Sequence, residues 1–124
     1  MGAQENLEMA KRGYAAFSSG DVEGAMADMA DDIVWVTPGA SAISGTATGK
    51  QEVGANWAAL AEKGFATSPQ HWFADDERVV VLAQVSLAGE NYDAADVLTF
   101  SGGKLVRFQT AGDTALLERT FPSG

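Results

Sequence analysis

The hydrophobic pattern of this chain changes once, near Gly64, from helical spacing to strand spacing. Before Gly64, apolar side chains recur every three or four positions, which is typical of amphipathic helices. After it, four segments rich in β-branched and aromatic residues are separated by short turns of Gly, Asp and Asn. Because helices followed by a run of hairpins build an antiparallel sheet, the pattern predicts an α+β fold rather than an alternating α/β fold.

Three helices are predicted in the first half of the chain. The first ends at Ser18-Ser-Gly-Asp21, and Asp21 is placed to cap a short second helix that is expected to run to about Asp32. The third is expected to begin at a capping box of Thr48 and Gln51. Their inner faces are expected to carry Leu7, Ala10, Tyr14 and Phe17, then Val22, Ala25, Met26 and Met29, then Val53, Trp57 and Leu60.

The strands are predicted from β-branched and aromatic runs. A first strand is expected at Ile33–Thr37, and Ser41–Gly49 is expected to be a loop or a weak edge strand. The later runs predict an antiparallel meander. Its strands are expected at Phe65–Ala74, Arg78–Ala88, Tyr92–Ser101 and Lys104–Ala111, with Leu82, Gln84, Val97, Leu105 and Arg107 facing outward.

Composition limits the class of protein. A length of 124 residues with 46% hydrophobic content predicts one domain over 1–124. Eight basic against 17 acidic residues give a net charge of -9, and no basic patch is present, so nucleic acid and anionic membranes are not expected as partners. The chain has no Cys and one His, so we expect no metal and no cofactor. With no long apolar run, a cytoplasmic protein is expected.

Asp96 is the clearest candidate for chemistry, because it lies within the largely apolar segment Tyr92–Phe100. An ionised side chain enters a strand core only when it is paired, protonated or used. Strand alternation places Asp96 on the same face as Leu98 and Phe100, and burial without a cation would raise its pKa. Asp96 is either a working group of a pocket or a structural carboxylate that accepts a hydrogen bond from Tyr14, Trp35 or Trp57.

Four segments together resemble the SnoaL-like branch of the NTF2-like superfamily. They are Tyr14–Met26, Ala30–Trp35, Ser44–Lys50 and Leu98–Phe108, and they span nearly the whole chain in the order and spacing of that branch. The resemblance implies a cone-shaped α+β barrel, in which three helices pack on a curved, mostly antiparallel sheet around an interior pocket. It also implies a homodimer through the outer sheet face.

Ketosteroid isomerase belongs to the same superfamily, and its site can be compared residue by residue. Asp96 matches the isomerase's protonated oxyanion-hole aspartate, a carboxylic acid that is held neutral by an apolar site. Thr37 stands where the isomerase has its general base, and a hydroxyl cannot do that work at neutral pH. Tyr14 lies one residue out of register with the oxyanion tyrosine. The resemblance thus keeps only half of an isomerase site.

Other activities of the superfamily compare as follows. A limonene-type epoxide hydrolase needs an arginine where Ala94 lies, and a scytalone-type dehydratase needs more than one histidine, whereas only His71 is present. A SnoaL-type cyclase needs one carboxylate and an apolar cavity, which Asp96 or Asp113 would supply, although Asp113 is better explained as a helix cap.

Two hypotheses therefore remain for function. One is a pocket protein that binds a small apolar or ring-containing molecule, and the alternative is a cofactor-independent isomerase or cyclase. The expected catalytic residues are Asp96, Tyr14 and His71. The expected ligand-binding residues are Phe17, Trp35, Thr37, Trp57, Val81, Val85, Leu98 and Phe108.

Overall fold

The computed structural model describes residues 2–123, in which four helices accompany one six-stranded sheet. In chain order the elements are α1 (Ala3–Ser18), α2 (Val22–Met26), β1 (Met29–Thr37), β2 (Gly45–Thr48), α3 (Lys50–Glu62), β3 (Ala66–Ala74), β4 (Arg78–Leu87), β5 (Glu90–Ser101), β6 (Lys104–Ala111) and α4 (Thr114–Thr120). None of the helices within these residues is long and apolar enough to cross a membrane.

The sheet has the order β2-β1-β6-β5-β4-β3. Strands β3 to β6 pair antiparallel in succession, which confirms the predicted meander. Strand β2 pairs antiparallel with β1 as an edge strand, and only β1 and β6 run parallel among the described strands. The sheet is therefore mostly antiparallel, as predicted.

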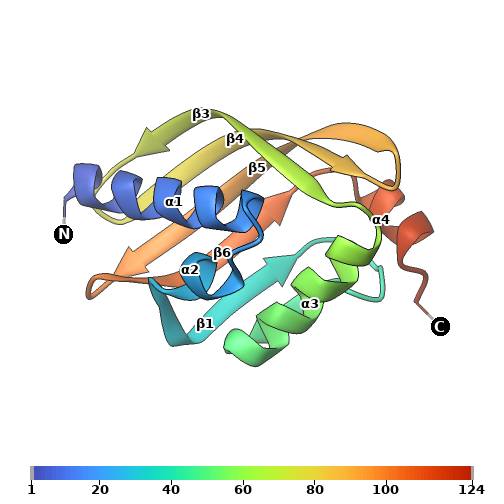
Figure 1. Ribbon diagram of the computed structural model, residues 1–124, viewed down its shortest axis with the longest axis horizontal. Coiled ribbons are helices and arrows are strands. Elements are labelled where there is room, and N and C mark those ends of the chain that lie inside the picture. Colours follow the sequence, from blue (N-terminus) through green and yellow to red (C-terminus); the bar gives the residue numbers. More distant parts are fainter. Residues whose placement is uncertain (1, 124) are drawn as a thin grey trace.

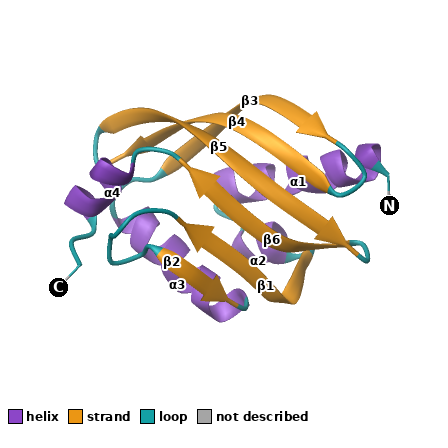
Figure 2. Cartoon of the chain, turned by 180° about the vertical axis from the view of Figure 1, so that it is seen from behind, coloured by secondary structure: helices purple, strands orange, loops and turns teal. Residues whose placement is uncertain are grey.

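The helices α1, α2 and α3 cover one face of the curved sheet (Figure 1). Seen from behind, the strands lie in front of all three helices, so the opposite face carries no helix of the described chain (Figure 2). The predicted α+β architecture, with three helices from the first half against a curved sheet, is confirmed. The fold leaves a space between the helices and the concave face.

The boundary between the second helix and the first strand differs from its prediction. Helix α2 ends at Met26, and β1 already begins at Met29, which is buried and pairs with Leu105 of β6. The Leu105 N–H donates to the Asp28 carbonyl at 2.8 Å, so pairing with β6 satisfies backbone groups that a longer helix would have used. Val22 was expected inside but is 53% exposed.

Two further local predictions were wrong. Thr48 ends β2 rather than capping α3, and its N–H donates to Glu52, not Gln51, while Gly49 begins the helix at a φ of 87°. Leu105 was expected outward but is buried, because a register shift sets Phe100 opposite Leu105 and Thr99 opposite Arg107. The extra residue on β6 is a bulge, and a bulge reverses the faces beyond it.

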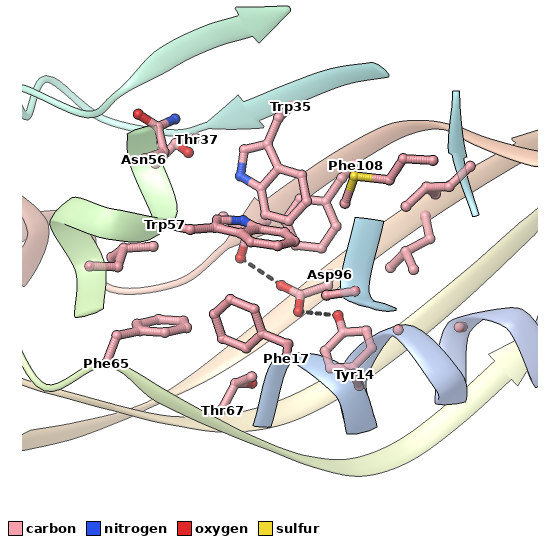
Figure 3. Close-up of a pocket in the computed structure, with 18 of the residues that line it drawn as sticks. Tyr14, Phe17, Trp35, Thr37, Asn56, Trp57, Phe65, Thr67, Asp96 and Phe108 are labelled. Atoms are coloured by element: carbon pink, nitrogen blue, oxygen red, sulfur yellow. Dashed lines mark hydrogen bonds between the residues drawn. The ribbon is translucent and has the colours of Figure 1, made fainter. Parts of the chain in front are cut away.

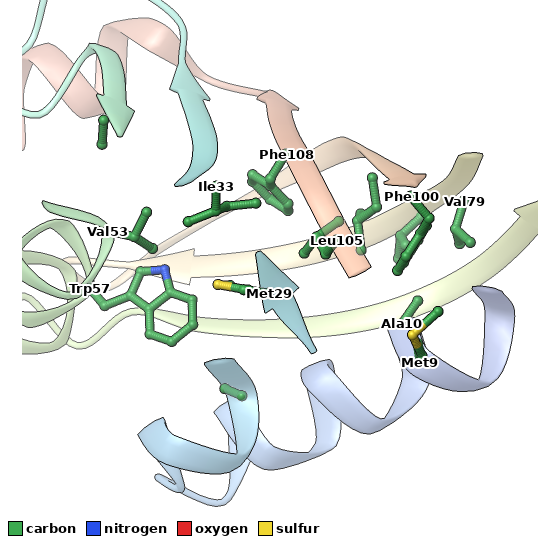
Figure 4. Packing of buried hydrophobic residues seen from close by; sticks show 14 of the residues in the cluster. Met9, Ala10, Met29, Ile33, Val53, Trp57, Val79, Phe100, Leu105 and Phe108 are labelled. Atoms are coloured by element: carbon green, nitrogen blue, oxygen red, sulfur yellow. The ribbon is translucent and has the colours of Figure 1, made fainter. Parts of the chain in front are cut away.

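Two clusters of buried side chains hold the fold together. The larger lies between the helices and the inner face of the sheet (Figure 4). The smaller includes Leu116 and Leu117 of α4, which packs at one end of the sheet. As predicted, Asp113 caps this helix, since its Oδ1 accepts from the Leu116 N–H at 2.9 Å.

Candidate functional site

Asp96 lies on the concave face of β5, where alternation along the strand turns it inward. It is only 6% exposed. Its neighbours across the sheet are Val81 on β4 and Thr110 on β6. The structure thus places this carboxylate on the inner face of the sheet, as expected.

Both carboxylate oxygens of Asp96 accept a hydrogen bond from a neutral side chain. The Tyr14 hydroxyl of α1 donates to Oδ2 at 2.5 Å, and the Thr110 hydroxyl of β6 donates to Oδ1 at 2.6 Å (Figure 3). Tyr14 is therefore the donor, out of the three that were considered from the sequence. A carboxylate has about four lone-pair sites, so two donors leave Asp96 able to accept from a further group.

Burial sets the protonation of this cluster. Desolvation raises the pKa of Asp96, and the hydrogen bonds from Thr110 and Tyr14 act in the opposite direction. Burial, followed by the charge of Asp96 and the bond to it, raises the pKa of Tyr14 well above its usual value. Burial also raises the pKa of Tyr92 to about 12. Both tyrosines thus stay protonated near neutral pH, and Asp96 is the group of this cluster that titrates first.

Aromatic rings form much of the cavity wall around Asp96. Trp35 stacks on Phe108 with ring centroids 3.7 Å apart, and Trp57 meets Trp35 edge to face at 5.6 Å. Phe17 of α1 meets Trp57 at 4.9 Å (Figure 3). The cavity measures about 120 Å³. Such concave apolar sites with a few polar groups are the usual form of small-molecule pockets.

Most residues selected from the sequence line this one cavity. They are Tyr14, Phe17, Trp35, Thr37, Trp57, Val85, Asp96, Leu98 and Phe108. Val81 faces the same side of the sheet, but it is fully buried within the larger core cluster and is not on the cavity wall. Helix α1 packs against β3 and β4, so the region that contains Val81 is filled by side chains.

His71 does not take part in the site. It is exposed on β3 and pairs with Leu82, which is itself exposed on the outer face. A register shift between Pro69 and His71 marks a bulge there, and the next residue, Trp72, is the one that meets Tyr14 edge to face at 5.4 Å. The structure thus places His71 outside the cavity that contains Asp96, and its role as a second polar group stays a prediction from the sequence.

Sequence reasoning missed five polar residues of the cavity wall, namely Asp28, Asn56, Thr67, Tyr92 and Thr110. Thr110 shares the inner face of β6 with Phe108, so the alternation that was applied to β5 would have found it. The hydroxyl of Thr67 is buried and has no hydrogen-bond partner within residues 2–123. Buried polar atoms without a partner are uncommon, and one in a cavity wall is a candidate ligand contact.

Tyr14→Phe is expected to raise the pKa of Asp96 further, because it removes a hydrogen bond that now lowers that pKa. The ring and its contact with Trp72 are kept. The carboxyl carbon chemical shift of Asp96, followed by NMR against pH, measures the change. Thr110→Val is the matched variant and should act in the same direction, whereas an unchanged or lowered midpoint in both would contradict the assigned bonds.

Known proteins were compared with the chain. A family model described as a SnoaL-like domain matches residues 10–108. An NTF2-like protein from Burkholderia xenovorans LB400 is 28% identical, with a TM-score of 0.80 over 96% of this chain and 97% of that one. TerC, which was co-crystallised with polyporic acid, is 25% identical, with a TM-score of 0.84 over 96% and 99%. A comparison with curated proteins gives no match.

A proposed ketosteroid isomerase from Kribbella flavida DSM 17836 shares the fold, at 17% identity and a TM-score of 0.76 over 90% of this chain and 79% of that one. The family match covers most of the chain and includes the residues on which the resemblance was based. The chain therefore belongs to the SnoaL-like domain family of NTF2-like proteins.

Proposed function

We propose that this protein binds a small, neutral, ring-containing molecule in the cavity, with a polar group of the ligand against Asp96. The observation that carries the proposal is a buried carboxylate, held by two neutral donors, in an aromatic-lined cavity. None of the cavity-lining residues is basic, and the net charge is -9, which disfavours an anionic ligand. The co-crystallisation of TerC with polyporic acid supports a ligand of the small-molecule class.

The size of the cavity limits what fits without rearrangement. At about 120 Å³ it is close to the engineered cavity of about 150 Å³ that accepts benzene, so one ring is the natural occupant. Small organic phenols are therefore suitable probes. Their hydroxyl donates to Asp96, while the ring contacts Trp35 and Trp57.

The experiment is a titration with phenol and 4-methylphenol, followed by tryptophan fluorescence and calorimetry. Saturable binding at one site is expected, and it should weaken about tenfold in Asp96→Asn, because hydrogen bonds to charged acceptors are stronger than those to neutral ones. Asp93→Asn is the control, since Asp93 is exposed on the same strand and faces outward. Absence of binding to the wild type up to about 1 mM, an affinity that would mean less than about 4 kcal/mol of binding free energy, would contradict the proposal.

A second candidate function is proton transfer, in the manner of an isomerase or a cyclase. It is favoured by the raised pKa of Asp96, because a carboxyl group with a pKa closer to neutrality is a better acid–base catalyst. Thr37 lines the same cavity but has no acid–base capacity near neutral pH. Thr37 therefore cannot share with Asp96 the work of removing and returning the proton.

We also propose that two copies associate through the outer face of the sheet. Phe73 and Leu82 are 59% and 38% exposed there, beside the half-buried Val80 and Val97. Burying this patch against a second copy would remove apolar surface from water. Leu82→Asp is expected to convert a dimer to a monomer in light scattering. Val22→Asp, at a more exposed apolar residue on α2, should leave the dimer intact, and a monomeric wild type would contradict the proposal.

A further inference from the structure

The cavity around Asp96 has a neighbour that opens to solvent. This second hollow is a groove between β2 and α3, and its wall includes Ser44, Thr46 and Glu52. Two residues, Ile43 and Asn56, line both the groove and the inner cavity. Both residues therefore lie between the buried site and the surface, and we call this place the junction.

The Ile43 side of the junction is held by an ordered loop. The Ser44 hydroxyl donates to the Pro38 carbonyl at 2.8 Å and accepts from the Ser41 N–H at 2.9 Å. The Ala42 N–H donates to the Phe121 carbonyl at 2.8 Å, which ties the loop to the segment after α4. Ile43 itself packs against the smaller core cluster. This side of the junction is thus fixed in place.

The Asn56 side offers hydrogen bonds. Asn56 is half-buried on α3, and its side chain makes no hydrogen bond to another residue between 2 and 123. A carboxamide both donates and accepts, so it matches a hydroxyl or a carbonyl group equally well. In the groove beyond it, Ser44 and Thr46 are neutral, and Glu52 is acidic and already accepts from the Thr48 N–H. No basic residue lines the groove, so an anionic end of a ligand is disfavoured there too.

We propose that the ligand is elongated, with its ring beside Asp96 and a neutral hydroxyl or carbonyl end that passes between Ile43 and Asn56 toward the groove. This inference rests on the proposed function. It makes Asn56 a residue that determines specificity and Ile43 a residue that sets the width of the passage. A molecule longer than one ring would then fit without rearrangement of Trp35.

The test compares 4-phenylphenol with 4,4′-dihydroxybiphenyl, which differ only in the second hydroxyl. The wild type should bind the diol about threefold to tenfold more tightly, the usual effect of one neutral hydrogen bond. Asn56→Leu should reduce this preference to about one, whereas Gln51→Leu, at an exposed amide of the same helix, should keep it. Equal binding of the two compounds by the wild type, or an unchanged preference in Asn56→Leu, would overturn the inference.

A second variant tests the passage without removing a polar group. Ile43→Trp should weaken both biphenyls at least tenfold more than it weakens phenol, which needs the inner cavity alone. Biphenyl binding at wild-type strength would place the route elsewhere and overturn the inference. Phenol binding to the wild type distinguishes a failure of this inference from a failure of the proposed function. If the wild type does not bind phenol, the proposed function itself is contradicted, and not only the passage at the junction.

Discussion

Asp96→Asn is expected to lower the rate of proton exchange at the carbon beside a bound ketone by a factor of about 10² to 10⁴, the usual contribution of a positioned acid–base group. Asp96 accepts hydrogen bonds from two hydroxyls, those of Tyr14 and Thr110, and its carboxylate is the basic group of this cluster that can take a carbon-bound proton. Asn keeps the shape and one acceptor but has no basic oxygen. The measurement is deuterium incorporation into 2-tetralone, followed by proton NMR.

The matched control is Asp93→Asn, which removes an exposed carboxylate three residues earlier on β5, and this variant should exchange at the wild-type rate. Melting temperatures of both variants within a few degrees of the wild type would show that the loss is chemical and not structural. A wild-type rate in Asp96→Asn would contradict the acid–base role of Asp96. Binding of 2-tetralone without any exchange above background would identify the protein as a ligand binder without this chemistry.

The same substitution has a predicted dependence of stability on pH. Because its pKa is raised by folding, Asp96 contributes most to the free energy of unfolding below its unfolded pKa of about 3.9. That contribution declines as the pH rises from there through the raised folded pKa. As the pH rises through this range, the wild type loses that contribution and Asp96→Asn does not. The free energy of unfolding of Asp96→Asn should therefore increase relative to that of the wild type. Urea denaturation at several pH values measures it, and a constant difference would contradict the raised pKa.

The general form of the site could be predicted because it depends on short periodicities. Alternation along β5 placed Asp96 on one face with Leu98, and the family resemblance identified that face as the concave one. Helical spacing on α1 placed Tyr14 on the inner face of that helix, as one of three possible donors to Asp96. Short polar turns separated the strands of the meander correctly. These features depend only on residues that are close together in the chain, so they can be predicted from a single sequence.

The errors occurred where the period of a strand is interrupted. One extra residue in β6 turned Leu105 inward, and a shift in β3 placed His71 outside and Trp72 inside. A bulge is selected by pairing with a neighbouring strand and leaves no mark in the spacing of apolar residues. The role of Asn56 was likewise hidden, because it depends on where α3 lies relative to the loop that carries Ile43.

Trp57→Ala is expected to cost about 3 to 5 kcal/mol of the free energy of unfolding, the range for deleting a large buried ring. Trp57 is 7% exposed and meets both Phe17 and Trp35 edge to face, so its loss removes one aromatic contact from each of these rings. The total stability of a domain is about 5 to 15 kcal/mol, so the variant retains a small margin. Urea denaturation measures the loss, and Trp57→Phe, which keeps an aromatic ring, should lose clearly less.

Adding indole to Trp57→Ala tests whether the space left by the deleted ring stays open or is closed by its neighbours. Because the deleted ring borders the cavity, the two spaces should merge, and added indole should refill the part that Trp57 occupied. Binding to the folded state alone raises stability by about 2.7 kcal/mol at 100 times the dissociation constant. The melting temperature of Trp57→Ala should therefore rise with indole concentration, more steeply than that of the wild type. An equal rise in both proteins would mean that Phe17 and Trp35 had closed the space, and that these rings, rather than Trp57, set the size of the ligand.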